Sequence, residues 1–215
     1  MPTKKIIFGH QKGGVGKSTL AYNTAYYLEN VANKKTLLID LDVQQTATNL
    51  NFLREVNGFG KLTVQIADSE DKLVRLIESN EYEYIVIDAG GFDAGINRVA
   101  IALSDVIITP ATTKITEIFG LGKFVEILDE INSITKSGIT AHVVLNNLHP
   151  STKDIKIIKD ICEDSSRIVL ANSIIRARAT FPATLAVGLS VFERGNGEDK
   201  AAEELENMIK ELILN

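Results

Sequence analysis

The sequence of 215 residues has little cysteine: Cys162 is the only one. A single cysteine cannot build a disulfide framework, and it cannot supply a cysteine-built zinc or iron–sulfur site within one chain. Such low cysteine usage is typical of a protein from a reducing compartment. We therefore expect Cys162 to be a small, buried apolar residue.

Long apolar runs are also missing, since none approaches the roughly 18 residues that a membrane-spanning helix needs. The amino terminus lacks a signal-peptide pattern, because a glycine-rich segment interrupts it early. These absences predict a cytoplasmic protein. An excess of basic charge is absent as well. The formal net charge of −5 argues against a globally basic nucleic-acid binder, although it permits a local basic patch.

The composition and the pattern of apolar runs predict a single folded domain over residues 1–215. Hydrophobic residues make up 45% of the chain and charged residues 24%, as in ordinary globular proteins. No internal repeat or linker-like stretch divides it. The expected strands are short, largely β-branched runs at 5–8, 36–39, 84–87, 106–108 and 141–145. The expected helices are at 19–28, 71–79, 117–131, 154–163 and 199–214.

These runs are too apolar for half-exposed strands, so they indicate central strands of a parallel sheet. Their alternation with helical segments predicts an α/β fold, in which a mostly parallel sheet has helices on both faces. In such a sheet, ligands bind outside the carboxyl ends of the strands. The polar residues that follow each apolar run are therefore the candidates for function.

The first such segment, QKGGVGKST at 11–19, lies between a strand and a helix. Its glycines let successive backbone N–H groups point at phosphate oxygens, and the following helix presents the positive end of its dipole. Lys17 is placed to reach the β- and γ-phosphates of ATP, and the Ser18 hydroxyl to bind Mg²⁺, with Thr19 able to assist. The expected nucleotide-binding residues here are Lys12, Gly13, Gly14, Val15, Gly16, Lys17, Ser18 and Thr19.

The segment departs from the strict Walker pattern, because Gln11 stands where the first glycine belongs. It resembles the deviant form K-G-G-x-G-K-[ST] of the ParA and MinD group of P-loop ATPases. In that group the first lysine crosses a dimer interface and touches the nucleotide of the partner. The resemblance implies that Lys12 takes part in catalysis with Lys17 and that ATP bridges a homodimer. A merely solvated Lys12 is the alternative.

Two carboxylates follow the second strand at Asp40 and Asp42, with Leu41 between them, and we assign them different roles. The segment resembles the D-x-D-P-Q switch of the same family. That likeness implies that Asp42 positions or activates the attacking water and that Asp40 supports the metal. Val43 replaces the usual proline, which implies a less rigid switch. Ordinary strand-terminal aspartates are the alternative.

Two further strand ends carry candidate residues. Asp88, followed by Gly90 and Gly91, resembles a Walker B strand and its switch loop, and its carboxylate is suited to holding Mg²⁺ through water. Asn146 offers a donor and an acceptor to an adenine edge, and relatives use a residue at this place for the base. We prefer Asn146 to Asn147, with simple turn asparagines as the alternative.

The likeness covers nearly the whole chain, because the segment from Ile175 to Glu204 resembles the carboxyl-terminal pattern of ParA proteins. The resemblance implies a small ParA-like domain without the amino-terminal DNA-binding extension of the larger forms. It implies an ATPase that is slow alone and that is stimulated by DNA and by a ParB-like or ribbon-helix-helix protein bound to a centromere. Such a protein segregates DNA and associates with the nucleoid.

Three other functions remain as alternatives. A MinD-like membrane-positioning ATPase normally ends in a basic amphipathic helix, whereas this chain ends in an acidic one, so we expect no stable membrane association. A nitrogenase-reductase-like redox role needs paired cysteines. A metabolic ligase or kinase on the same fold would need a small molecule rather than DNA and a protein partner.

Nonspecific DNA binding requires basic side chains gathered on one face. Two groups are candidates: Lys153, Lys156 and Lys159, expected on one helix, and Arg176 with Arg178, expected in the loop beyond. Lysines three residues apart share a helical face, which predicts a basic stripe. An ordinary solvated helix surface is the alternative.

Overall fold

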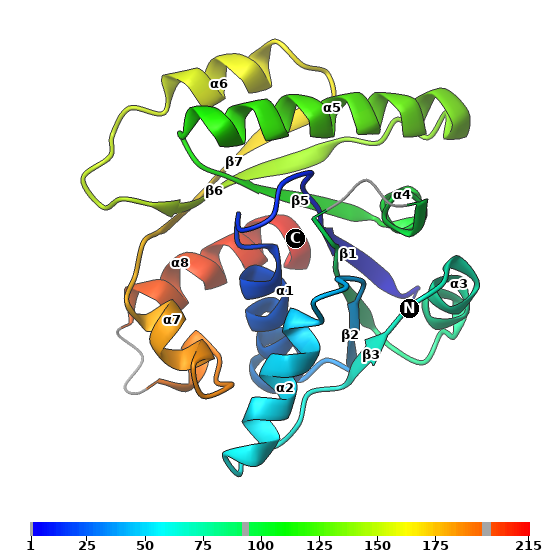
Figure 1. The fold of residues 1–215 in the computed structure, drawn as a ribbon, viewed down its shortest axis with the longest axis vertical. Helices are drawn as coiled ribbons and strands as arrows, with labels where there is room; N and C mark the ends of the chain where they lie inside the picture. Colours follow the sequence, from blue (N-terminus) through cyan, green and yellow to red (C-terminus); the bar gives the residue numbers. More distant parts are fainter. Residues whose placement is uncertain (1, 92–94, 195–198) are drawn as a thin grey trace.

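A computed structural model describes residues 2–91, 95–194 and 199–215 of the chain. Its seven-stranded sheet has the order β3-β2-β4-β1-β5-β6-β7, and every pairing between these strands is parallel (Figure 1). The strands are β1 (Lys4–Phe8), β2 (Thr36–Asp40), β3 (Val64–Ile66), β4 (Tyr84–Asp88), β5 (Val106–Ala111), β6 (Ala141–Leu148) and β7 (Ile168–Arg176).

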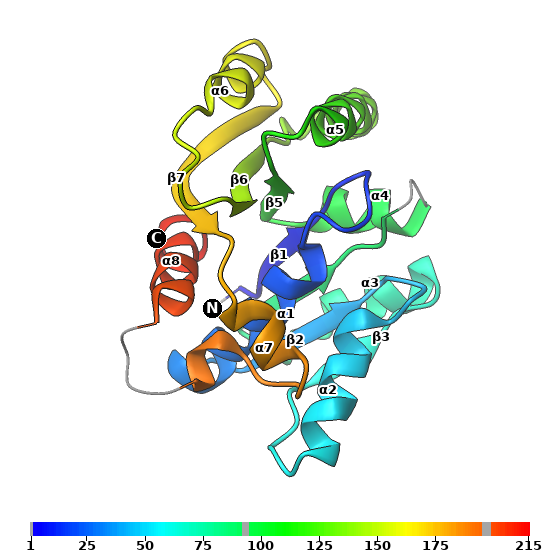
Figure 2. The same ribbon diagram turned by 60° about the vertical axis from the view of Figure 1, so that its left-hand side comes forward.

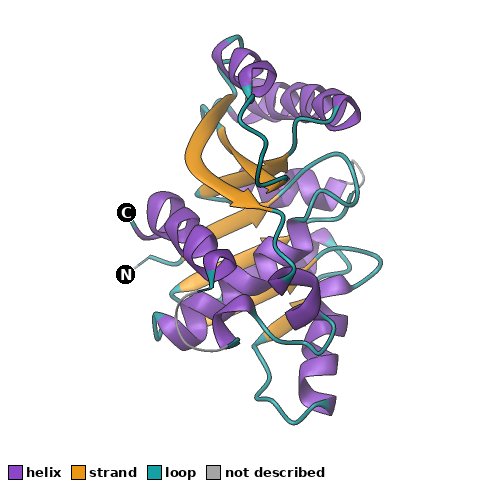
Figure 3. Ribbon diagram, turned by 90° about the vertical axis from the view of Figure 1, so that its left-hand side faces the viewer, coloured by secondary structure: helices purple, strands orange, loops and turns teal. Residues whose placement is uncertain are grey.

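Helices α1 to α6 connect successive strands, α7 and α8 follow β7, and the helices cover both faces of the sheet (Figures 2 and 3). They are α1 (Lys17–Tyr26), α2 (Thr46–Val56), α3 (Glu70–Glu78), α4 (Gly95–Leu103), α5 (Ile115–Thr135), α6 (Lys156–Glu163), α7 (Thr180–Leu185) and α8 (Lys200–Ile209). Wider π-helical turns extend α1 over Tyr27–Val31 and α8 over Lys210–Leu214. Within the described residues, no helix is both long enough and apolar enough to cross a bilayer.

The core has two halves because successive strand residues point to opposite faces of the sheet. Ile7 of β1 and Ile87 of β4 belong to the half that packs against α3, α4, α5 and α6. Ile6 of β1 and Val86 of β4 belong to the half under α1 and α8. Both faces of the central strands are therefore buried, as their continuous apolar sequences predicted. The α/β fold with helices on both faces is confirmed.

All five predicted strands are confirmed, and the burial of Cys162 is confirmed as well. Two placements were wrong. The helix expected from residue 154 begins at Lys156, so Lys153 lies before it. Arg176 is the last residue of β7 and does not lie in a loop. Strands β3 and β7 were not predicted: β3 has only three residues, and the apolar run at 168–171 that begins β7 is followed by polar Asn172 and Ser173.

The segment after α7 ties the carboxyl-terminal part of the chain to α1. The Tyr22 hydroxyl donates to the carbonyl of Gly188 at 2.6 Å. The buried Asn23 side chain accepts through Oδ1 from the Ser190 hydroxyl and from the Val191 N–H, both at 2.8 Å. These hydrogen bonds are buried, so they hold the helix that follows the phosphate loop in one position.

The same segment also contacts α2. Arg54 is 5% exposed and forms a two-pronged ion pair with Glu193, with 2.7 Å between Nη2 and Oε1. Gly188 has a φ of +76°, and a Cβ atom there would lie 2.3 Å from the backbone nitrogen of Arg54. Only glycine fits this position, because any side chain would collide with the backbone of α2.

The close approach at Gly188 predicts a large stability loss for Gly188→Ala. Gly138→Ala is the matched control, because Gly138 also has a positive φ, +70°, but a Cβ atom there would meet nothing within 4 Å. The control should lose about 1–2 kcal/mol of unfolding free energy from backbone strain. Gly188→Ala should lose about 3 kcal/mol or more, because the steric clash adds to that strain. Urea unfolding measures both, and equal losses would contradict the packing described here.

Candidate functional site

The phosphate loop connects the end of β1 to the first residue of α1, Lys17. Gly14 and Gly16 have φ values of +79° and +101°, which favour glycine. Asn146, at the end of β6, donates from Nδ2 to the carbonyl of Val15 at 2.8 Å, across 131 residues of sequence. A Cβ atom on Gly16 would lie 2.2 Å from that same nitrogen. The loop is thus fixed by a side chain from a distant part of the chain.

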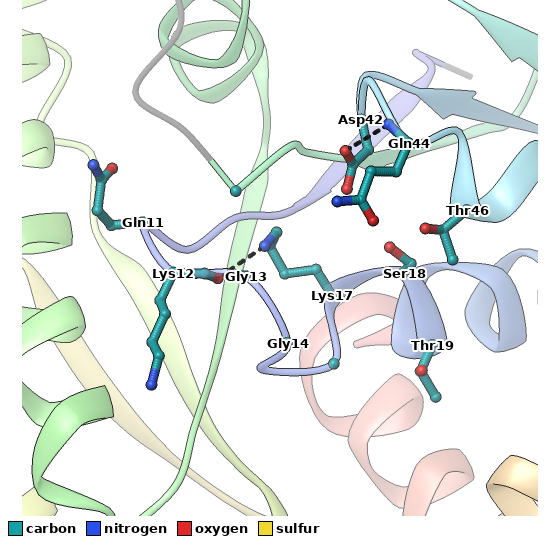
Figure 4. A pocket seen from close by; sticks show the side chains of 12 residues that line it. Gln11, Lys12, Gly13, Gly14, Lys17, Ser18, Thr19, Asp42, Gln44 and Thr46 are labelled. Atoms are coloured by element: carbon teal, nitrogen blue, oxygen red, sulfur yellow. Dashed lines mark hydrogen bonds between the residues drawn. The ribbon is translucent and has the colours of Figure 1, made fainter.

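The loop borders a cavity of about 680 Å³ (Figure 4). It is lined by Gln11, Lys12, Gly13, Gly14, Gly16, Lys17, Ser18, Thr19, Asp42, Gln44, Thr46 and Gly91. The two lysine side chains extend in different directions: Lys17 points towards the backbone carbonyl of Lys12, and the Lys12 side chain points away from Lys17 and Asp42 (Figure 4). The structure therefore brings four of the expected site residues, Lys12, Lys17, Ser18 and Asp42, to one cavity.

Lys17 is 5% exposed, and its Nζ donates to the carbonyl of Lys12 at 3.1 Å. Burial lowers the pKa of Lys17, while the nearby carboxylates of Asp88 and Asp42 oppose that shift. An anion in the cavity would favour the charged ammonium in the same way. The arrangement is suited to binding a phosphate group.

The two aspartates after β2 have different surroundings. Asp40 is fully buried, and its oxygens accept from the N–H of Asp42 at 3.1 Å and from the N–H and hydroxyl of Thr48 at 2.9 Å each. Asp42 lines the cavity and accepts from the N–H of Gln44 at 3.0 Å. Asp40 therefore holds the loop and the first turn of α2 in place, and Asp42 faces the opening.

Asp88 is a buried carboxylate next to Asp40, its register partner on the neighbouring strand. Neither of its oxygens has a hydrogen-bond partner among the described residues. Burial raises the pKa of Asp88 to about 8, although the Ser18 hydroxyl lies close enough to oppose the shift. Lys17 also lowers this pKa, while Asp40 and Asp42 raise it. Unpaired oxygen ligands beside a hydroxyl fit Mg²⁺, which prefers hard oxygen donors.

A second cavity of about 240 Å³ opens on the other side of the loop and contains Asn146. Its lining also includes Gly14, Val15, Gly16, Thr19, Asn147, Arg176, Arg178, Phe181, Pro182 and Leu185. Both arginines already have protein partners. Arg178 pairs with Glu204 at 2.5 Å, and Arg176 donates from Nη1 to the carbonyl of Thr152 at 2.8 Å.

The lysines proposed for DNA contact are exposed but lie among acidic side chains. Lys156 and Lys159 are on α6, and Lys153 precedes it. Lys159 lies 3.6 Å from Glu163, an exposed pair that contributes little to stability. The acidic residues of this segment are Asp154, Asp160, Glu163 and Asp164. The predicted basic stripe is therefore interrupted by negative charge.

Some cavity residues were not singled out from the sequence. Gln44 and Thr46 line the main cavity, and Phe181 with Pro182 lines the second one. Gln44 and Thr46 could have been found from their position just after Asp42, in the segment that follows β2. Phe181 and Pro182 follow β7, so they would have been found by the strand-end rule if β7 had been predicted.

Comparison with known proteins agrees with this geometry. A model of the CobQ/CobB/MinD/ParA nucleotide binding domain matches residues 6–191. The chromosome-partitioning ATPase Soj of Thermus thermophilus is 25% identical over 158 residues, which are 60% of this chain and 63% of that protein. The maintenance of carboxysome distribution protein A of Halothiobacillus neapolitanus is 23% identical over 210 residues, 97% of this chain and 95% of that protein.

Solved structures confirm the fold. A plasmid partition protein of Borrelia burgdorferi bound to AMPPNP has a TM-score of 0.72 and 20% identity, with 97% of each chain covered. At this identity the likeness shows the fold alone. The chain spans 36% and 63% of the length of two curated relatives that it matches.

The buried Asp88 predicts a pH-dependent stability in protein free of nucleotide and metal. Its folded pKa of about 8 lies above the unfolded value of about 4, so the stabilisation by the protonated form is complete below pH 4 and is lost as the pH rises through 8. Asp88→Asn removes this titration. Urea unfolding with a chelator should show wild type losing a few kcal/mol relative to the variant between pH 5 and pH 8.5. A pH-independent difference would contradict the assignment.

Proposed function

The chain belongs to the CobQ/CobB/MinD/ParA nucleotide-binding family, and from this premise we propose that it is an ATP-dependent DNA partition ATPase. ATP joins two copies of the chain into a homodimer, the dimer binds nonspecific DNA, and a centromere-bound protein stimulates hydrolysis and release. The observation that carries the proposal is the single cavity shared by Lys12, Lys17, Ser18 and Asp42. The protein would then act in the cytoplasm, on the nucleoid.

In this proposal the cavity binds the triphosphate of ATP. Lys17 binds the β- and γ-phosphates, and the backbone N–H groups of the loop surround them. Ser18 and Asp88 hold Mg²⁺, which would neutralise charge on the phosphates. Asp40 supports this site indirectly, because its oxygens accept hydrogen bonds from Asp42 in the switch loop and from Thr48 in α2.

Asp42 is the proposed residue for positioning the attacking water. Its carboxylate faces the cavity and is held to the loop by the Gln44 N–H. A carboxylate there can accept a proton from water that attacks the γ-phosphate. Asn146 is the proposed contact for the adenine base, because it lies in the second cavity beside the phosphate loop. Its Nδ2 already binds Val15, so we assign the base contact to Oδ1.

Lys12 is proposed to reach the nucleotide of the second copy. It extends away from Lys17 and Asp42, so both lysines cannot serve the same phosphates from one side. ATP bound between two copies stabilises the dimer by linkage, since ligand that binds only the dimer favours association. Hydrolysis then removes that stabilisation and releases the dimer from DNA.

A second candidate cargo comes from the relatives. The carboxysome distribution protein matches 97% of this chain, so a bacterial body other than a DNA replicon is the alternative cargo for the same ATPase cycle. Membrane positioning has less support. Helix α8 and its extension carry Glu203, Glu204, Glu206 and Glu211, which anionic lipid would repel.

Substituting each of the two lysines should affect nucleotide binding and dimerisation separately. Lys17→Ala should lose ATP affinity by at least about 30-fold, because it removes the buried charge nearest the phosphates. Lys12→Ala should bind ATP within about threefold of wild type but should not dimerise with a slowly hydrolysed ATP analogue. Calorimetry measures the affinity for ATP, and sedimentation measures how much dimer forms. Tight ATP binding by Lys17→Ala, or a normal dimer of Lys12→Ala, would contradict these roles.

DNA binding should require ATP, because one copy offers few phosphate contacts and two linked copies offer twice as many. Filter binding to random duplex DNA should be strong with ATP, weak with ADP, and steeply weakened by salt. A combined change of Lys153, Lys156 and Lys159 to alanine tests the α6 patch. If the triple variant still binds DNA, the DNA contact lies outside the α6 patch. If wild-type protein does not bind DNA even at low salt, the proposed partition function is contradicted.

A further inference from the structure

His10 lies between the end of β1 and the phosphate loop, and its ring is 2% exposed. Its Nδ1 accepts a hydrogen bond from the backbone N–H of Lys12 at 2.9 Å. The bond closes a short turn around Gln11, so it sets the direction in which the chain carries Lys12. No phosphate role is assigned to His10, and the family motif begins after it.

The ring is held from its other side by α5. It stacks on Phe124, with 6.2 Å between the ring centroids and 11° between the ring planes. Gly120 faces the ring edge, and a Cβ atom at Gly120 would lie 2.7 Å from Cε1 of His10 and 3.4 Å from Cβ of Lys12. Helix α5 therefore presses both His10 and the stem of Lys12 against the loop, and a side chain larger than hydrogen does not fit there.

The hydrogen bond requires a neutral imidazole with its proton on Nε2. Burial, followed by the charges of Lys17 and Lys12, lowers the pKa of His10 to about 4, so the ring is neutral at physiological pH. Nε2 has no partner among the described residues. His10 borders a cavity of about 20 Å³ that is also lined by Ala89 and Gly90 and has enough room for one water.

We propose that His10 is a positioning residue for Lys12: its ring, wedged between α5 and the phosphate loop, fixes the path by which Lys12 reaches the second copy of the chain. The inference rests on the proposed role of Lys12 at the dimer. It assigns a specific task to a side chain that is not among those lining the cavity beside the phosphate loop. Gly120 contributes to the same positioning, since only glycine allows α5 to approach the His10 ring this closely.

The test compares His10→Asn with His10→Leu. The Oδ1 atom of asparagine is bonded to Cγ, as Nδ1 of histidine is, so asparagine can accept the Lys12 N–H while leucine cannot. His10→Leu should weaken the ATP-dependent dimer about tenfold, the effect of losing one buried hydrogen bond. His10→Asn should restore dimerisation to within about threefold of wild type. Both should bind ATP as monomers within about threefold of wild type.

A pair of glycines on α5 provides an independent test in which His10 itself is not substituted. Gly120→Ala should weaken the dimer, because its Cβ would displace the ring. Gly122→Ala is the matched control, two residues along the same helix, where a Cβ atom would meet nothing within 4 Å. Both changes raise helix propensity by about 1 kcal/mol, so they differ in the contacts of the new Cβ atom, which at Gly120 are with the His10 ring and, at 3.4 Å, with Cβ of Lys12. If His10→Leu does not fold, this pair decides the question.

Sedimentation with a slowly hydrolysed ATP analogue measures the dimer, and calorimetry measures ATP binding. Lys12→Ala is measured alongside the other variants. A weakened dimer in His10→Leu with rescue by asparagine supports the proposal. Normal dimers of His10→Leu and Gly120→Ala, when Lys12→Ala fails to dimerise, would overturn it and leave the proposed function intact. Normal dimerisation by Lys12→Ala would overturn both. Loss of ATP binding by monomeric His10→Leu would show that the ring supports the whole loop, which also overturns a role specific to Lys12.

Discussion

The parallel register of β2, β4 and β1 determines where the chemistry of this protein lies. Asp88 is the register partner of both Asp40 on β2 and Phe8 on β1. Two carboxylates and the start of the phosphate loop therefore reach the same level at the carboxyl edge of the sheet. A shift of β4 by one residue would turn the Asp88 side chain to the opposite face. The buried apolar faces of these strands oppose such a shift, so core packing and site geometry depend on the same register.

The site holds polar groups that the protein itself leaves incompletely paired. Asp88 has no hydrogen-bond partner among the described residues, and burial shifts its pKa and that of Lys17 towards their neutral forms. Burying such groups reduces the stability of the protein without ligand. A cation near Asp88 and an anion near Lys17 would each restore the charged form. The charges of the site would therefore suit a bound metal–phosphate complex, which is the ligand expected from the phosphate-loop sequence.

The sequence predicted those parts of the structure that depend on neighbouring residues. The apolar runs of β1, β2, β4, β5 and β6 and the glycine-rich loop are local signals, and each was found at its place. Strand β7 was missed because polar Asn172 and Ser173 interrupt its apolar residues, so Arg176 was assigned to a loop. The contacts of Asn146 with Val15 and of Gly188 with Arg54 join segments more than a hundred residues apart. Spacing and composition carry no information about such pairs.

Helix α2 is fixed at both ends, and this limits where the switch loop can move. At its first turn, Thr48 binds the buried Asp40 through two hydrogen bonds. At its last turn, Arg54 pairs with Glu193 on the segment that is also bonded to α1. Breaking a buried ion pair is costly, so the helix resists displacement as a whole. The connection at residues 41–45 is less constrained, because Val43 is 84% exposed and has no ring to lock φ as proline has. If the protein acts as proposed, this short segment, and not α2, is the part that would convert the state of the γ-phosphate into a change at the surface.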